Sequence, residues 1–225
     1  MALARISKIC LDAVDPGVIG PFWAALLHGR WRPADGEGGV YPADSDRPWL
    51  WINRVPEPKT VKNRVHLDVY AHSLVEVEAL GAVVALPEGE DRRWTVMVDP
   101  EGGEFCAFLR DPVPEPRLHG FVVDCADPFA VAGFWHTVLG GRLDDNGGRW
   151  GTIEGAAAYT LDFVPVPEPK IVKNRVHLDL AGPAMEPILA AGARVLREPD
   201  GNDEWYVLGD PEGNEFCLFI RPERT

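Results

Sequence analysis

The chain has 225 residues, of which 46% are hydrophobic and 25% charged, and its net charge at pH 7 is −13. This is a globular composition, and the negative charge argues against nucleic acid as a partner, because an acidic surface repels a phosphate backbone. No apolar run approaches the roughly 18 residues that a membrane span needs. We therefore expect no membrane partner.

The cysteines and the N-terminal segment bear on the compartment. The four cysteines include no CxxC spacing, which is typical of reduced thiols. Arg5 and Lys8 place charge where the core of a secretory signal would lie. We predict a cytoplasmic protein that is a monomer or a homodimer.

The first half of the chain has the pattern of alternating strands and helices. Residues 6–14 are β-branched and apolar, which predicts a strand. Asp15 and Pro16 then have the pattern of an N-cap and a first helical position, and Gly29 ends the predicted helix. Residues 34–48 are rich in Gly, Asp and Pro and predict an exposed loop. Further strands are predicted over 30–33, 49–55, 64–70, 83–86, 94–98 and 104–109, and a helix over 73–80.

The same pattern then restarts, because two segments occur twice. VPEPKTVKNRVHLD at 55–68 returns as VPEPKIVKNRVHLD at 166–179, and DPEGGEFCAFLR at 99–110 returns as DPEGNEFCLFIR at 210–221. Phe-Trp pairs on the first helix of each copy are expected to lie in the core. The repeat predicts two domains, 1–112 and 118–225, joined by a proline-rich linker at 113–117.

Each repeat has the layout of two βαβββ-like units, which predicts an α+β fold with helices on one face of a mixed sheet. This layout, with RVHLDV and DPEGGEFCAF in one half and RVHLDL and DPEGNEFCLF in the other, resembles the vicinal oxygen chelate (VOC) superfamily. The resemblance is strongest to tandem glyoxalase-like proteins of the glyoxalase/bleomycin resistance/dioxygenase type. It implies two tandem domains, each with paired units that form a curved mixed sheet around a cup-shaped cavity for a small organic molecule.

The resemblance also implies where a metal would bind. The family's ligand positions fall on His66 and Glu104 in the first repeat and on His177 and Glu215 in the second. Both residue types suit Zn, Fe, Mn or Ni. Two ligands are too few for a tight divalent site. We therefore expect either no cofactor or a divalent metal.

The third ligand position departs from the family pattern. It falls on Lys8 in the first repeat and on Gly120 in the second, counted back from the Phe-Trp pair. A lysine must lose a proton before it can bind a metal. His119 lies one residue from the expected place, and a β-bulge could turn it inward to complete a triad with His177 and Glu215.

The histidine and glutamate of each repeat have the same spacing, since 104 − 66 = 38 and 215 − 177 = 38. A histidine beside a carboxylate can act as a general base near neutral pH, so His66, Glu104, His177 and Glu215 are the candidate catalytic residues. The alternative is a hydrogen-bonded pair across neighbouring strands that touches no ligand.

Aromatic and basic side chains are the candidate ligand contacts, because aromatic walls suit flat organic molecules. For the tryptophans the alternative is ordinary core. The arginines share a strand face with Asp68 and Asp179, and could instead form an internal ion-pair network with them. The candidates are Trp94, Trp205, Trp51, Arg64 and Arg175.

These observations favour a glyoxalase-like protein that binds a small organic molecule without a complete metal site, as resistance and sequestration proteins do. The alternative is a VOC enzyme of the lyase, isomerase or dioxygenase type. It would depend on a metal or use the His/Glu pair in acid–base catalysis. Fold alone does not decide between them.

Overall fold

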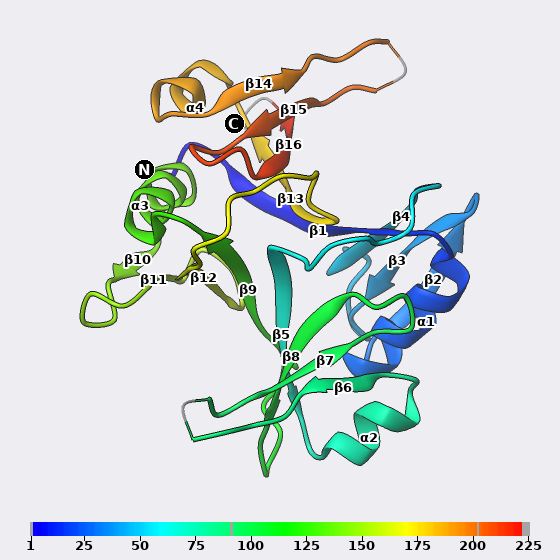
Figure 1. Ribbon diagram of the computed structural model, residues 1–225. Coiled ribbons are helices and arrows are strands. Elements are labelled where there is room, and N and C mark those ends of the chain that lie inside the picture. The colour runs from blue at the N-terminus through cyan, green and yellow to red at the C-terminus, as the bar shows by residue number, and fades with distance from the viewer. Residues whose placement is uncertain (1, 91, 202, 222–225) are drawn as a thin grey trace. The chain divides into compact units, whose positions relative to one another are not determined.

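A computed structural model describes residues 2–90, 92–201 and 203–221 (Figure 1). The helices are α1 (Pro16–Leu26), α2 (Leu74–Ala79), α3 (Pro128–Leu139) and α4 (Glu186–Ala190). The strands of the first repeat are β1 (Arg5–Ala13), β2 (Arg30–Ala34), β3 (Glu37–Tyr41), β4 (Leu50–Arg54), β5 (Val65–Ala71), β6 (Val83–Leu86), β7 (Thr95–Val98) and β8 (Glu104–Leu109). Those of the second are β9 (Leu118–Cys125), β10 (Arg142–Asp144), β11 (Gly151–Glu154), β12 (Thr160–Pro165), β13 (Val176–Gly182), β14 (Arg194–Arg197), β15 (Tyr206–Gly209) and β16 (Glu215–Ile220).

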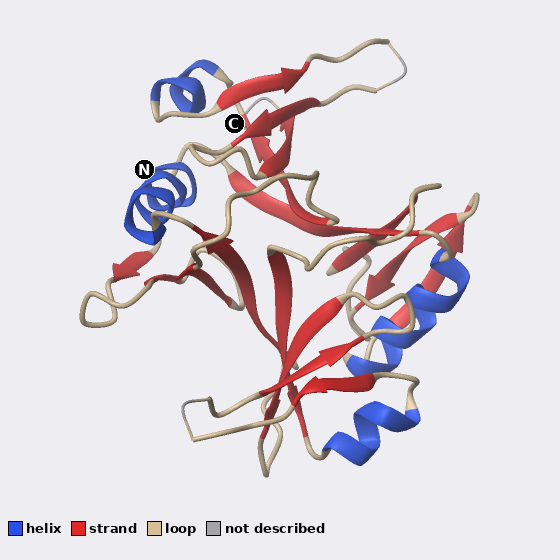
Figure 2. Ribbon diagram, in the orientation of Figure 1, coloured by secondary structure: helices blue, strands red, loops and turns tan. Residues whose placement is uncertain are grey.

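These elements follow one order four times: a strand, a helix and three strands (Figure 2). The predicted α+β class and the βαβββ unit are therefore confirmed. Helix α1 packs on β2, β3 and β4, and α3 packs on β10, β11 and β12 in the same way. Within the described part of the chain, no helix is long and apolar enough to cross a membrane.

The strands form two mixed sheets, and each sheet draws on both sequence repeats. The first has the order β14-β15-β16-β13-β1-β4-β3-β2, and the second β10-β11-β12-β9-β5-β8-β7-β6. The pairs β13–β16 and β5–β8 are parallel, whereas the hairpins beside them are antiparallel.

The chain also divides into two compact units. One comprises residues 1–9 and 122–225, and the other residues 10–121. Strands β1 and β9 each contribute residues to both units. The boundaries expected from the sequence, 1–112 and 118–225, follow the repeat, whereas the compact units assign the start of β1 to the second repeat.

The exposed loop predicted over 34–48 is wrong in its first part, because β3 lies there between β2 and β4. Its glycines make room for aromatic rings. A Cβ atom on Gly38 would lie 2.5 Å from the ring of Trp31, and one on Gly39 would lie 2.5 Å from the ring of Tyr41. Glycine is required here because side chains approach the backbone of a strand closely. Composition alone does not distinguish such a strand from a turn.

The helix starts and the core follow the predictions. Asp15 Oδ1 accepts the N–H of Gly17 at the start of α1. Trp23 is buried against Phe105 with ring centroids 5.4 Å apart, and Trp135 and Phe216 of the second repeat are 5.1 Å apart. The expected burial of both Phe-Trp pairs is confirmed.

The DPEG turn near the end of each repeat accepts hydrogen bonds from the start of that repeat's first helix. The Glu101 carboxylate accepts the N–H groups of Val14 at 2.8 Å and Asp15 at 2.6 Å. Glu212 makes the corresponding pair of hydrogen bonds in the second repeat. Asp99 accepts the N–H of Glu101, and burial raises the pKa of this aspartate to about 6. The aspartate and glutamate of the DPEG turn therefore have a structural role.

Candidate functional site

The parallel pair β13–β16 gathers polar side chains on one face of the first sheet. Asp179 lies opposite Cys217, so His177 lies opposite Glu215. The residues between them, such as Phe216, are fully buried in the core. Because side chains alternate along a strand, the four polar side chains share the other face. Pair β5–β8 has the same register in the second sheet.

Glu215 is held by the repeated segment that precedes β13. One carboxylate oxygen lies 2.7 Å from Lys170 Nζ, and the other accepts the N–H of Asn174 at 3.1 Å. The side chains of Lys170 and Glu215 are each only 14% exposed. An ammonium and a carboxylate form a stronger hydrogen bond than neutral groups do, so this pair fixes the segment against β16.

Glu104 is held in the same way in the first repeat. Its oxygens lie 2.7 Å from Lys59 Nζ and 3.0 Å from the backbone nitrogen of Asn63. The sequence predicted histidine as the partner of each glutamate, whereas these contacts are with lysine and backbone. The catalytic roles assigned to His66 and His177 with their glutamates stay predictions.

An internal ion pair lies beside His177 in the first sheet. Asp179 is 4% exposed, and its Oδ2 lies 3.1 Å from Lys8 Nζ on the neighbouring strand. Its Oδ1 lies 3.6 Å from His177 Nε2. Burial raises the pKa of Asp179, but the contacts with His177 and Lys8 outweigh burial and hold that pKa below its usual value. Asp179 therefore forms an ion pair with Lys8, whereas the network predicted for it with the arginines stays a prediction.

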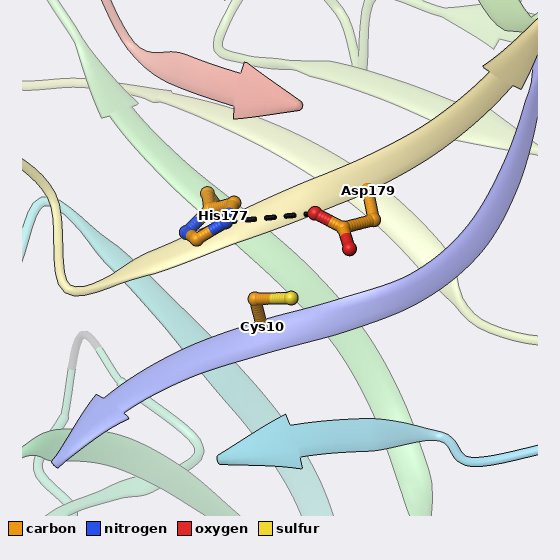
Figure 3. Close-up of side chains that lie close together, drawn as sticks. All are labelled: Cys10, His177 and Asp179. Carbon is orange, nitrogen blue, oxygen red and sulfur yellow. Dashed lines mark ion pairs between the residues drawn. The ribbon is translucent and has the colours of Figure 1, made fainter. Parts of the chain in front are cut away.

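The same face retains hydrogen-bonding capacity. Within the described residues, His177 Nδ1 and Asp179 Oδ1 are buried and have no hydrogen-bond partner. Cys217 Sγ lies 3.6 Å from His177 Nε2, and burial raises the pKa of this thiol. Figure 3 shows Cys10 of β1 beside His177 and Asp179 of β13, and the potential ligand atoms of these three lie within 4.8 Å of one another. Buried polar atoms without partners are rare in proteins, and a catalytic role or a bound water or ion can explain them.

The second sheet has a related group of side chains. His66 Nε2 lies 3.5 Å from Asp68 Oδ1, and the potential ligand atoms of His66, Asp68 and Cys106 lie within 4.8 Å of one another. Gly120 is the sequence counterpart of Lys8 on β9.

His119 is not brought onto the same sheet as His177 and Glu215. It belongs to β9 of the second sheet, whereas β13 and β16 belong to the first. Its ring stacks on Tyr70 with centroids 4.4 Å apart and meets Phe108 edge-on at 5.0 Å. The His119–His177–Glu215 triad stays a prediction, since His119 belongs to the compact unit 10–121 and the other two residues belong to the other unit.

The candidate tryptophans lie partly exposed on the sheets. Trp205 packs on Phe219 with ring centroids 5.4 Å apart. Trp94 stacks on Phe108 at 5.6 Å, and Trp51 Nε1 donates to Glu37 at 3.0 Å. Arg64 and Arg175 immediately precede β5 and β13. The roles of these residues in ligand binding stay predictions.

The ion-pair role of Lys8 was not predicted, because the sequence only showed that a lysine stands where the family has a metal ligand. Its Nζ lies near Asp179 and 5.6 Å from the centre of the Phe219 ring. A divalent ion at the family's positions in the first sheet would meet the ammonium groups of Lys8 and Lys170, which already neutralise Asp179 and Glu215. These residues do not fit a metal there.

Solved structures share this fold. Glyoxalase I from Zea mays is 13% identical, with a TM-score of 0.64 over 96% of this chain and 92% of that chain. A putative dioxygenase from Bacillus subtilis is 13% identical, with a TM-score of 0.66 over 96% and 85%. This chain therefore has the fold of these two proteins. A search of curated proteins finds no match. A family model described as a glyoxalase-like domain matches residues 8–108 and 120–219, so the chain belongs to that family.

Proposed function

We propose that this protein binds a small planar organic anion on the first sheet, around Lys8, His177 and Asp179, without a metal ion. The observation that carries the proposal is the 3.1 Å contact between Lys8 Nζ and Asp179 Oδ2. An ammonium there balances the buried carboxylate, as a metal ion otherwise would. The unpartnered Nδ1 of His177 supplies a further polar contact.

Aromatic rings beside Lys8 support a planar ligand. The Phe219 ring lies 5.6 Å from Lys8 Nζ, and Trp205 packs on Phe219. Both rings are partly exposed, and the Lys8 side chain is 26% exposed. An ammonium carries three donor hydrogens, so it can contact an anionic oxygen of a ligand whose ring lies against the aromatic pair.

The second candidate function is an enzyme that uses His177 as a general base. A buried carboxylate at 3.6 Å favours this reading, because it can orient an imidazole and stabilise its charged form. A metal-dependent enzyme has less support in the first sheet than a metal-free one, since Glu215 already pairs with Lys170. Catalytic turnover of a bound compound that His177→Gln abolishes would favour the enzyme.

A calorimetric titration with 1-naphthoate tests the binding proposal. Protein treated with a chelator is expected to bind this planar carboxylate as well as untreated protein does. Trp205→Ala is expected to weaken binding about fivefold, because an aromatic contact contributes roughly 1 kcal/mol. Trp150→Ala, in the β10–β11 connection, is the matched control and should leave binding unchanged. Binding that requires an added metal ion, or that ignores Trp205→Ala, would contradict the proposal.

A further inference from the structure

We propose that Tyr70 holds, in the second sheet, the place that the aromatic ring of the ligand takes in the first sheet. Each chain therefore binds one ligand and not two. This inference rests on the proposed function, because it concerns the same planar anion, and it adds that the ligand is aromatic. Tyr70 and its counterpart Ala181 are then the residues that determine which sheet is open to the ligand.

In the first sheet, Phe219 of β16 has two cationic side chains close to its ring. Lys8 Nζ lies 5.6 Å and the guanidinium carbon of Arg221 lies 5.7 Å from the ring centre. Trp205 packs on the same ring with centroids 5.4 Å apart. Both rings are partly exposed, and the Arg221 side chain is 56% exposed. This group of side chains therefore offers aromatic surface and positive charge to a ligand.

The second sheet repeats this arrangement around Phe108 of β8. Trp94 stacks on the Phe108 ring at 5.6 Å, and the guanidinium carbon of Arg110 lies 6.0 Å from the ring centre. His119 meets the ring edge-on at 5.0 Å. The phenylalanine, tryptophan and arginine are sequence repeats, since 219 − 108 = 111, 205 − 94 = 111 and 221 − 110 = 111. The two sheets thus share one aromatic and cationic frame.

The two frames differ at the residue paired with the phenylalanine. Tyr70 of β5 is paired with Phe108, whereas Ala181 of β13 is paired with Phe219. Because side chains alternate along a strand, both residues face the same side as the histidine and aspartate that precede them. A phenol ring therefore lies in the second sheet where the first sheet has only a methyl group.

The Tyr70 ring makes the contacts that suit a bound aromatic ligand. It stacks on the His119 ring with centroids 4.4 Å apart and an angle of 25° between the planes. The guanidinium carbon of Arg110 lies 5.6 Å from its centre. Stacking and a nearby cation both stabilise an aromatic ring. Tyr70 thus shows, within this chain, how the frame receives such a ring.

A ring attached to the strand competes strongly with a free ligand. A group on a short tether has an effective concentration that is roughly millimolar, so a ligand at the second sheet would have to displace the Tyr70 ring. Ala181 brings no ring to the first sheet, where Phe219 and Trp205 are partly exposed. The ligand's ring can therefore lie against Phe219 with its anionic group at Lys8.

Calorimetric titration of the full chain with 1-naphthoate counts the sites. The wild type is expected to bind one naphthoate per chain, Tyr70→Ala two, and Ala181→Tyr none. Tyr70→Phe keeps the ring and should still bind one. The second site of Tyr70→Ala should depend on the cation beside it, so Tyr70→Ala/Arg110→Gln should bind one again.

A matched control separates the position of the added ring from its size. Ala158→Tyr adds the same ring at an exposed position in the β11–β12 connection and should leave binding unchanged. Circular dichroism checks that each variant is folded, and misfolding cannot create the second site of Tyr70→Ala. Two sites in the wild type, a single site in Tyr70→Ala, or unchanged binding by Ala181→Tyr would overturn this inference and leave the proposed function in place. A wild type that binds no naphthoate would overturn both.

Discussion

Replacement of Lys8 by methionine is expected to lower the free energy of unfolding by about 3 kcal/mol, because removal of one partner leaves a buried charge uncompensated. Asp179 is the charge in question, and its side chain is only 5% exposed. Methionine keeps most of the volume of the lysine stem. Urea denaturation of wild type and variant at pH 7 measures the difference.

The pH dependence of this difference identifies its cause. The pKa of Asp179 in the folded protein lies below its usual value, so the ion pair contributes stability above the unfolded pKa of about 4 and loses it as the pH falls. The wild type should therefore lose its advantage over Lys8→Met below about pH 4. The double variant Lys8→Met/Asp179→Asn should recover most of the stability at pH 7. A double variant no more stable than the single one would show that Asp179 is not the cause.

Glu215→Gln is expected to lower the free energy of unfolding by about 2 kcal/mol, because it removes a charge-assisted hydrogen bond and leaves the ammonium of Lys170 without its carboxylate. The loss should be local. The Asn174 N–H, which donates to Glu215 at 3.1 Å, should exchange with solvent faster. Hydrogen exchange followed by NMR measures this amide directly.

Two controls accompany this prediction. Glu104→Gln should produce the same loss at the Asn63 amide in the other repeat, because the contacts are equivalent. Glu204→Gln should change little, since that side chain is 82% exposed. Unchanged exchange at Asn174 in Glu215→Gln would mean that the glutamate does not fix the segment.

Much of the fold could be predicted because its signals are local. The Asp-Pro helix starts, the buried Phe-Trp pairs and the alternation through 64–70 each depend on neighbouring residues. Strand β3 was missed because Gly38 and Gly39 resemble a turn, and only the rings of Trp31 and Tyr41 explain them. Sheet membership depends on contacts between distant segments, which one sequence does not encode visibly.

The candidate site was also predictable only where its signals are local. Strand alternation placed His177 and Asp179 on one face, and the register of β13 agrees. The lysine partners could not be predicted, because Lys170 lies 45 residues from Glu215 in sequence and meets it only through the path of the loop. Lys8 reaches Asp179 from the other repeat in sequence.

The repeated segment thus has a structural explanation. Its lysine and asparagine hold the glutamate of the last strand in both copies. Its histidine and aspartate face the same side of the sheet in both. The copies differ on the strand beside that histidine and aspartate, which carries Lys8 in β1 and Gly120 at the corresponding position of β9. A duplicated scaffold can retain its framework in this way while the two binding groups acquire different chemistry.

Anomalous diffraction from crystals soaked in Co²⁺ tests most directly whether lysine stands in place of a metal ion in the first sheet. The expected map has no peak within coordination distance of His177, Asp179 or Glu215, because Lys8 and Lys170 already neutralise the two carboxylates. A peak between His177 and Glu215 would contradict the account, because it would show that a metal ion displaces the ammonium groups that neutralise this face.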